Sequence, residues 1–514
     1  MIKLLEETGY HYHPLYRFYG WEFADTITPV KPCGAKTLGE FYLACRKAWN
    51  AETCSAKFRP LWSAENPSVG QCTITAKLVH EFFGGEVLWL PLEGGGRHNF
   101  NRIRGVIIDL ACEQFGADAL LDFPDAHPGD PESLVKDPDK AERCELLRGR
   151  LAGILFGGQA ELPESEALRF TRALRCGWNL GNTFDAFDDA FTGAEPEMET
   201  RWCGTRVTKE LIHAIAAAGF GVIRIPVSWH NHVDENFRIH PLWMARVKEV
   251  VIWAYEAGLT VILNSHHDMN RAFCYPEKEL LPLSEKYIRA VWQQIAEEFS
   301  AFDARLIFEG MNEPRFKDKE GEWCFDAQSA ASQEAMACIN ALNQCFVSTV
   351  RAAGGNNAGR YLMVPAYAAR PDAAASALFR LPEDITEGKL IVSAHAYSPF
   401  TFCLESPGTD VFDSGNAVQT GEILSSIGLL RDSFTARGIP VILGEFGAQD
   451  KHNLESRIAC MQYYVSAAKA AGIPCVIWDN SYFESGDEFF GLINRKTAEW
   501  VYPEIVKALL EASR

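Results

Sequence analysis

Short apolar runs alternate with longer segments of helical periodicity through the last two thirds of the chain. The apolar runs, which have the length and composition of buried strands, span residues 176–184, 221–229, 260–268, 305–314, 361–367, 390–399, 440–448 and 474–480. Glycine, which supplies the left-handed residue that closes a helix, follows five of the helical segments, at Gly219, Gly258, Gly354, Gly438 and Gly472. Strands that alternate with helices form parallel sheets, and eight repeats in about 350 residues predict an α/β fold of the (β/α)8 TIM-barrel type.

The first 157 residues lack this alternation and predict a separate, smaller α+β domain at 1–157. An acidic, proline-rich stretch at 122–142 is typical of a surface loop, and the segment after it predicts a short amphipathic helix. Gly157 and Gly158 would then end this helix. We therefore expect a linker at 158–167 and the barrel domain at 168–514.

The chain is acidic, with 68 Asp and Glu against 49 Lys and Arg and a formal net charge of −19. Such a surface repels nucleic acid and anionic membranes, so neither is expected as a partner. The 15 cysteines form no CxxC pair, and we expect no metal and no cofactor. The first residues lack an apolar h-region, which predicts a cytoplasmic protein, or a secreted one if the N-terminus is incomplete. The oligomeric state stays open.

Polar and aromatic side chains stand at the ends of six of the predicted barrel strands. They are Arg224, His266, His267, Asn312, Glu313, His395, Tyr397, Glu445 and Trp478. Any one of them alone is equally well explained as a turn or cap residue. The C-terminal ends of the strands meet at one rim of such a barrel, where the active sites of this fold lie. The agreement among six strands therefore predicts an active site at this rim.

Two of these residues, Glu313 and Glu445, end strands that lie on opposite sides of the predicted barrel mouth. Hydrolysis of a glycosidic bond uses two such carboxyl groups, one that protonates the leaving oxygen and one that attacks carbon or activates water. The Arg224 guanidinium and the Tyr397 hydroxyl are placed to keep a neighbouring carboxylate ionised. Glycoside hydrolysis is therefore the leading hypothesis, and a carbohydrate-binding protein without catalysis is the alternative that the two glutamates argue against.

The same segments resemble the motif series of glycoside hydrolase family 5, in particular its branch of bacterial endoglucanases and xyloglucanases. The resemblance covers residues 165–514. It is carried by GWNLGNTFDA, FGVIRIPVSWHNHV, VILNSHHD, LIFEGMNEPR, SAHAYSPF, VILGEFGA and IWDN, and by ETRWCG with Cys203 as an insertion.

The resemblance implies a role for each rim residue. Glu313 would be the general acid/base, with a raised pKa, and Glu445 the nucleophile. Arg224 and Tyr397 would support Glu445, and His395 would support Glu313. His266, His267 and Asn312 would bind sugar hydroxyls, and Trp478 would lie beneath the sugar ring. The family retains anomeric configuration, so we expect carboxyl groups about 5–5.5 Å apart.

The implied substrate is a β-linked oligo- or polysaccharide cleaved at β-1,4 bonds, as by a cellulase or endoglucanase. Xyloglucan, mixed-linkage glucan, xylan and mannan remain alternatives, as does endo or exo action. The segment DMNRAFCYPEKELLP after His267 lacks a tryptophan expected there in endoglucanases, which leaves the preferred glycan open.

A second group of residues in the N-terminal part has the chain order of a thiol enzyme. Cys72 opens a predicted helix, where a thiolate is favoured, and His98 and Asp109 follow on predicted strands. The alternative is an inert buried cysteine beside an unrelated histidine. This region also resembles the small bacterial YunG-like proteins, which implies a papain-like fold. A thiol-dependent amidase or peptidase activity at Cys72 would make the chain bifunctional.

Overall fold

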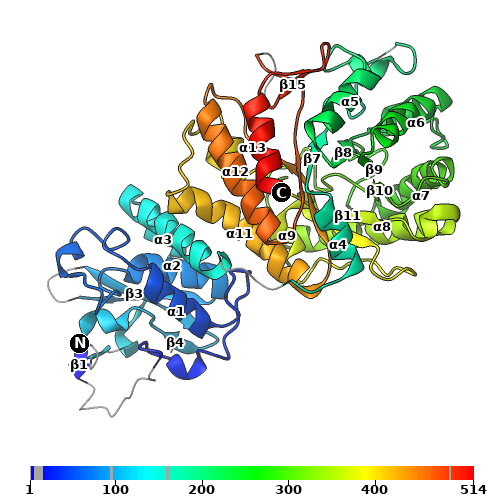
Figure 1. Cartoon of the computed structure of the whole chain (residues 1–514). Helices are drawn as coiled ribbons and strands as arrows, with labels where there is room; N and C mark the ends of the chain where they lie inside the picture. The colour runs from blue at the N-terminus through cyan, green and yellow to red at the C-terminus, as the bar shows by residue number, and fades with distance from the viewer. Residues whose placement is uncertain are drawn as a thin grey trace. The chain divides into compact units, whose positions relative to one another are not determined.

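The computed structural model describes residues 2–4, 15–92, 96–116, 119–121, 123–157, 162–188, 190–191, 193–484 and 488–514. The chain divides into two compact units (Figure 1). The first is Met1–Gly158 with Gly415–Leu429, and the second is Gln159–Ser414 with Leu430–Arg514. Residues 158–161 of the predicted linker lie outside the described residues, and the predicted domain limits stay a prediction.

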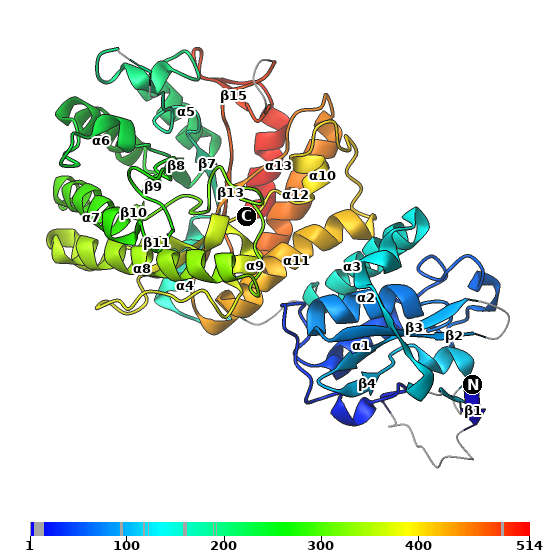
Figure 2. The ribbon, with the colours of Figure 1, turned by 180° about the vertical axis from the view of Figure 1, so that it is seen from behind.

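Eight parallel strands close into a barrel in the second unit, as predicted. Each strand pairs with its neighbours in chain order, and the last pairs with the first. Figures 1 and 2 show these strands at the centre of the unit with helices around them. The strands are β7 (Cys176–Asn179), β8 (Val222–Ile225), β9 (Thr260–Asn264), β10 (Leu306–Glu309), β11 (Leu362–Pro365), β12 (Leu390–His395), β13 (Val441–Phe446) and β14 (Cys475–Ile477).

Helices connect these strands and begin and end where local sequence dictates. The Thr208 hydroxyl accepts the Leu211 N–H at the start of one helix, and the Ser165 hydroxyl accepts the Leu168 N–H at the start of another. All five glycines expected to end helices have positive φ. The helices of the chain from residue 166 onward are α4 (Glu166–Ala173), α5 (Lys209–Ala218), α6 (Pro241–Glu256), α7 (Leu281–Glu298), α8 (Ala330–Ala352), α9 (Pro371–Ala374), α10 (Phe400–Cys403), α11 (Ala417–Ser433), α12 (Leu454–Ala470) and α13 (Pro503–Ser513), and a hairpin joins β15 (Ile493–Asn494) to β16 (Glu499–Trp500).

Strand β10 illustrates how the barrel buries both of its faces. Ile307 belongs to the cluster of apolar side chains inside the barrel, together with residues of other strands such as Ile262 and Ile442. Successive residues of a strand point to opposite faces. Phe308 accordingly packs on the helix side, against Trp292. The next inward position is occupied by a carboxylate, Glu309, which is completely buried.

The first unit is a mixed α+β structure, as predicted. Antiparallel strands β2 (Glu86–Pro91), β3 (Arg97–Ile103), β4 (Val106–Ile108) and β6 (His127–Gly129) form a sheet in the order β4-β3-β2-β6. Strands β1 (Ile2–Leu4) and β5 (Ala119–Leu121) form a separate pair. The α-helices of its segment Met1–Gly158 are α1 (Leu38–Ala48), α2 (Cys72–Phe83) and α3 (Pro138–Phe156). The papain-like character of this unit stays a prediction.

The prediction of a surface loop at 122–142 was only partly right. It contains strand β6, and its last residues already belong to helix α3. The helix begins earlier than predicted because the Asp137 carboxylate accepts the Lys140 N–H and Pro138 occupies the first helical position. Within the described ranges, no helix is long and apolar enough to cross a membrane.

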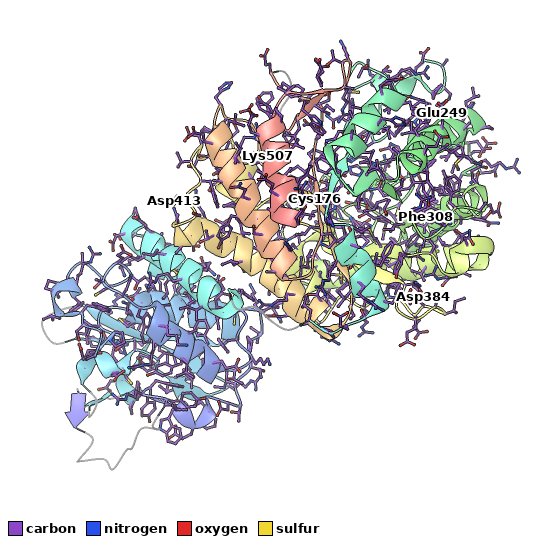
Figure 3. The ribbon with its side chains drawn as sticks, in the orientation of Figure 1. Cys176, Glu249, Phe308, Asp384, Asp413 and Lys507 are labelled. Carbon is purple, nitrogen blue, oxygen red and sulfur yellow. The ribbon has the colours of Figure 1, made fainter. Side chains whose placement is uncertain are left out.

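Replacing Phe308 tests the packing between the barrel and its helices. The Phe308 ring lies 5.3 Å from the Trp292 ring and 4.6 Å from the Arg360 guanidinium carbon, among the packed side chains of Figure 3. Phe308→Ala should lower the free energy of unfolding by about 3–5 kcal/mol, because it leaves a cavity. Denaturant unfolding measures the loss. Ile385→Ala, which truncates a side chain that is 83% exposed, is the control and should change little. Equal losses in both variants would contradict the assignment.

Candidate active site

The predicted rim residues converge on one buried cation, Arg224 of β8. Its Nε donates to Glu309 Oε2 at 2.7 Å and its Nη1 to Glu445 Oε1 at 2.7 Å. The remaining contacts run from Nη1 to Asn179 Oδ1 at 3.0 Å and from Nη2 to Asn312 Oδ1 at 2.6 Å. Although burial lowers the pKa of Arg224, the charges of Glu309 and Glu445 raise it above its ordinary value. The guanidinium therefore stays charged and fixes four side chains.

Glu445 is held as an ordered carboxylate. Arg224 binds one oxygen, and the Tyr397 hydroxyl donates to the other at 2.9 Å. Burial and the charge of Glu445 hold the pKa of Tyr397 well above its ordinary value, so its hydroxyl keeps the proton that it donates. A carboxylate that is oriented by two donors and only 7% exposed is suited to attack an electrophilic carbon.

Glu313 lies beside a histidine. His395 Nδ1 is 2.8 Å from Glu313 Oε1 and 3.7 Å from Glu445 Oε2. Burial raises the pKa of Glu313, but the hydrogen bond and charge of His395 lower it below its ordinary value. The expectation of a raised pKa for Glu313 was therefore wrong for the free enzyme. Burial lowers the pKa of His395, and the charge of Glu445 with the hydrogen bond to Glu313 raises it above its ordinary value.

The two glutamates are close enough for a retaining glycosidase. One carboxylate oxygen of Glu313, one of Glu445 and a ring nitrogen of His395 all lie within 4.8 Å of one another. Retaining enzymes separate their carboxyl groups by about 5–5.5 Å, and inverting enzymes by about 6.5–9.5 Å to admit a water. The geometry therefore favours direct attack by one carboxylate.

The two consecutive histidines after β9 are neutral. Burial holds the pKa of His266 well below its ordinary value and lowers that of His267 to about 3. His266 Nδ1 lies 3.1 Å from the Asn264 amide nitrogen, which assigns the proton to Nε2, 4.0 Å from Glu445 Oε1. The His266 ring is parallel to Trp478, at 5.8 Å between centroids. These rings offer a neutral donor and an apolar face beside the carboxylates.

Three residues that sequence reasoning missed complete the site. Glu309 is the second carboxylate on Arg224, and it also accepts from Asn264 Nδ2 at 3.0 Å and from the Ser393 hydroxyl. The others are Asn179, which accepts from Arg224, and Arg315, whose Nη1 donates to the Glu313 carbonyl at 3.0 Å. Glu309 could have been found from the sequence, because it is a single carboxylate inside the apolar run of β10, four residues before Glu313.

A second cluster at the rim could offer ligand atoms to a metal. Asp185, His266 and His267 each place one such atom within 4.8 Å of the others. The Asp185 oxygens, however, accept the backbone N–H groups of Asn182 at 2.9 Å and Thr183 at 2.7 Å. These bonds explain the position of Asp185 as a turn-closing residue.

The predicted N-terminal group also comes together. Cys72 is the first residue of α2, His98 lies on β3, and Asp109 follows β4. His98 Nε2 is 2.6 Å from Asp109 Oδ2, and its Nδ1 is 3.1 Å from Gln114 Nε2. Burial raises the pKa of the Cys72 thiol, but the hydrogen bond and charge of His98 lower it below its ordinary value. All three residues are buried.

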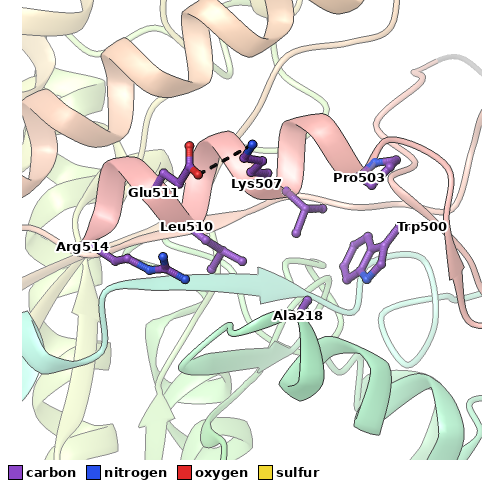
Figure 4. A pocket seen from close by; sticks show the side chains of 8 residues that line it. Ala218, Trp500, Pro503, Lys507, Leu510, Glu511 and Arg514 are labelled. Carbon is purple, nitrogen blue, oxygen red and sulfur yellow. Dashed lines mark ion pairs between the residues drawn. The ribbon is translucent and has the colours of Figure 1, made fainter.

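A separate pocket of about 280 Å³ lies between α5, β16 and α13 (Figure 4). It is lined by Ala218, Trp500, Pro503, Val506, Lys507, Leu510, Glu511 and Arg514. Helix α5 ends at Ala218 just before β8 begins, so the pocket lies at the end of the barrel where strands start. Its place distinguishes it from the rim with the two glutamates.

A barrel that presents two close carboxylates, a buried arginine and an indole at the C-terminal ends of its strands defines a glycosidase of the retaining class. The family model described as Cellulase (glycosyl hydrolase family 5) matches residues 185–484. The chain belongs to glycoside hydrolase family 5 and is a glycoside hydrolase. A second family model, the YunG protein, matches residues 37–155, in agreement with the predicted resemblance.

Known relatives agree with this assignment. Endoglucanase B of Ruminococcus albus is 41% identical over 333 residues, which is 64% of this chain and 76% of that protein. Endoglucanase A of the same organism is 35% identical over 384 residues, which is 74% of this chain and 99% of that protein.

Solved structures agree as well. A family 5 lichenase from Caldicellulosiruptor sp. F32, a mutant in complex with cellotetraose, superposes with a TM-score of 0.68 at 43% identity, covering 70% of this chain and 98% of that chain. A GH5-4 broad-specificity endoglucanase from Ruminococcus champanellensis with bound cellotriose gives 0.63 at 38% identity, covering 68% and 100%.

Replacing Glu309 tests the role of Arg224. Glu309→Gln removes one of the two negative charges on a buried guanidinium, so we expect Arg224 to shift and kcat to fall about 10–100-fold, with KM changing less. The free energy of unfolding should also fall, since breaking a buried pair costs about 3–5 kcal/mol. Steady-state kinetics and denaturant unfolding measure both effects. Glu298→Gln, in a surface pair with Lys248, is the matched control and should cost about 0–1 kcal/mol. Unchanged kcat in Glu309→Gln would exclude this role.

The contact between His395 and Glu313 should make stability depend on pH. The pKa of Glu313 is lowered from 4.5, so its contribution is present above pH 4.5 and is lost as pH falls through the folded-state pKa. The pKa of His395 is raised from 6.5, so its contribution is present below pH 6.5 and is lost as pH rises through the folded-state pKa.

Thermal unfolding of the wild type and of His395→Gln across this range is the measurement. The difference in Tm should be largest between pH 4.5 and 6.5 and should shrink on both sides. His213→Gln, at an exposed position, controls for loss of a histidine. A pH-independent difference would mean that the pair contributes no charge interaction.

Proposed function

We propose that the barrel hydrolyses β-1,4 bonds of glucans with retention of configuration, with Glu445 as nucleophile and Glu313 as general acid/base. The observation that carries this proposal is the approach of the two carboxylates to within 4.8 Å, one beside Arg224 and the other beside His395. That separation leaves no room for an attacking water between carboxylate and sugar.

In the first step Glu445 attacks the anomeric carbon while Glu313 protonates the leaving oxygen. A glycosyl ester forms on Glu445, and the leaving sugar departs with the proton. In the free enzyme the 2.8 Å contact between His395 Nδ1 and Glu313 Oε1 is the place that can hold this proton. Substrate binding removes water from Glu313, which favours the neutral acid and moves the proton from His395 to Glu313.

In the second step Glu313, now a carboxylate, takes a proton from water as the water attacks the anomeric carbon. The ester bond to Glu445 breaks, and the carboxylate returns to its bonds with Arg224 and Tyr397. Two inversions at the same carbon give net retention. Asn312 assists at the sugar, since its oxygen accepts from Arg224 and its amide N–H groups are left to donate to hydroxyls.

The neighbouring side chains fit a neutral sugar ring. His266 presents its Nε2–H beside Glu445, and His267 is neutral too, so neither adds charge at the subsite. Trp478 supplies the aromatic face parallel to His266. Structures of relatives hold cellotetraose or cellotriose, which supports a β-1,4-glucan. The relative that holds cellotetraose is described as a lichenase, and a further relative with cellotriose as a xyloglucan-specific endo-β-1,4-glucanase. Mixed-linkage glucan and xyloglucan are therefore the substrates to compare first.

Glutamine variants separate the two roles. Glu445→Gln should lower kcat by at least about 10³-fold, because the amide cannot form the glycosyl ester, while binding of cello-oligosaccharide persists. Glu313→Gln should lower kcat by about 10²–10⁴-fold, and less for substrates whose leaving group needs no proton. Added azide should restore turnover in Glu313→Gln and give a β-glycosyl azide.

The stereochemical outcome is measured by following the first-formed anomer by NMR. A β-configured product supports the proposal, and an α-configured product refutes the retaining mechanism. Glu256→Gln, which alters an exposed carboxylate paired with Lys209, should keep full activity. Product sizes from cellulose derivatives, mixed-linkage glucan, xyloglucan, xylan and mannan identify the preferred glycan and the endo or exo mode.

A further inference from the structure

The first unit contains a buried relay of a carboxylate, an imidazole and a thiol that the glycosidase chemistry does not use. Asp109 is fixed from three sides: its Oδ1 accepts the Ala111 N–H at 3.1 Å, and its backbone N–H and C=O both pair with Tyr19. Its Oδ2 lies 2.6 Å from His98 Nε2. Asp109 is 1% exposed and His98 is completely buried, so water does not weaken this contact.

The hydrogen bond to Asp109 determines which ring nitrogen of His98 can act as a base. Because Asp109 takes the proton on Nε2, the neutral ring keeps its lone pair on Nδ1. Nδ1 lies 3.1 Å from Gln114 Nε2, which also donates to the Ala111 carbonyl at 2.9 Å. The Cys72 thiol, with which His98 also hydrogen-bonds, therefore shares this side of the ring with the Gln114 amide.

The start of helix α2 places Cys72 where negative charge is stabilised. The first N–H groups of a helix have no intrahelical partner and carry partial positive charge. The backbone N–H of Asn99 on β3 also hydrogen-bonds with the thiol, and the Asn99 amide ties β3 to the helix through a 3.0 Å bond to the Thr73 hydroxyl. Two secondary-structure elements therefore fix the sulfur relative to His98.

The environment of Cys72 is opposite to that of other buried cysteines. Burial raises the pKa of Cys33 and of Cys144 to about 11. Burial also acts on Cys72, but hydrogen bonding and charge from His98 and the Asn99 N–H leave its pKa lowered. Burial lowers the pKa of His98, whereas Asp109 and Cys72 raise it to about 10. These opposite shifts favour an ion pair between the sulfur and the imidazole.

We propose that Cys72, His98 and Asp109 form a second catalytic site, which transfers acyl groups from small esters or thioesters. Cys72 is the nucleophile, His98 the general base and acid, and Asp109 the positioning residue that orients the ring. Only 8% of Cys72 is exposed, so the acyl group that reaches the sulfur must be small. The N–H groups of Cys72 and Thr73 at the helix start are placed to stabilise the carbonyl oxygen.

The reaction requires only the ester or thioester and water. The Cys72 thiolate adds to the carbonyl carbon, and the bond from that carbon to the leaving oxygen or sulfur breaks as His98 Nδ1–H protonates the leaving group. A thioester on Cys72 remains. His98 Nδ1 then removes a proton from water, the hydroxide adds to the thioester carbon, and the carbon–sulfur bond breaks. A carboxylic acid is released, and the thiolate–imidazolium pair is restored.

The test uses the full chain and two probes, iodoacetamide and p-nitrophenyl acetate. Alkylation of each cysteine is followed by mass spectrometry between pH 6 and 8. The rate at an ordinary thiol falls about tenfold per pH unit below a pKa near 8.5. The rate at Cys72 should change less than about threefold over this range, because the sulfur is already ionised. The exposed Cys324 is the internal reference, and the buried Cys45 should stay unlabelled while the protein is folded.

With p-nitrophenyl acetate we expect a burst of about one equivalent of nitrophenolate and an acetyl group on the peptide that contains Cys72. Cys72→Ser should abolish both. His98→Ala should give Cys72 the pH slope of an ordinary thiol, and Asp109→Asn should slow acetylation at least about tenfold. If His98→Ala does not fold, His98→Gln replaces it. An unlabelled Cys72, an ordinary pH slope in the wild type, or acetylation unaffected by His98 would each overturn the proposal.

Discussion

The burial of one guanidinium inside the barrel organises the rim. Moving an isolated charge from water into a protein interior is strongly unfavourable unless the charge is paired and its donors are used. Arg224 meets this requirement with the carboxylates of Glu309 and Glu445 and the amide oxygens of Asn179 and Asn312. These partners come from β7, β10 and β13 and from the segment after β10. One desolvated cation therefore links the wall of the barrel to a carboxylate at its mouth.

The contact between His395 and the two glutamates depends on a backbone detail. The pairing of β12 with β13 shifts register between Ala394 and His395, which brings His395 opposite Glu445. Gly444 precedes that glutamate, and a Cβ on it would lie 3.1 Å from His395 Nε2. A side chain at position 444 would thus press on the imidazole that sits between the carboxylates. Strand register and one missing side chain together place a proton donor within reach of both glutamates.

The sequence predicts the barrel and most of its rim. The barrel follows from the alternation of strand-like and helical segments, and the rim follows from the position of polar residues at strand ends. Apolar runs of strand length, glycines after helices and polar residues at strand ends are visible without coordinates. Glu309 was missed because it lies within the apolar run rather than at its end. The pKa of Glu313 was predicted in the wrong direction because its environment depends on the 2.8 Å contact with His395, from a strand 82 residues away. The pKa of such a side chain depends on its distance from charged groups on strands that are far away in the sequence, and the sequence does not give these distances.

Both units place a histidine against a carboxylate, and the third group decides what each pair can do. In the barrel, His395 contacts Glu313 and lies near Glu445, so two oxygens compete for its proton and one of them can pass it to a leaving group. In the first unit, His98 contacts one carboxylate and the Gln114 amide and hydrogen-bonds with one thiol. A thiol gives up its proton far more readily than a sugar or water hydroxyl. The imidazole there takes a proton from sulfur and generates a nucleophile, whereas His395 retains a proton for an acid beside it.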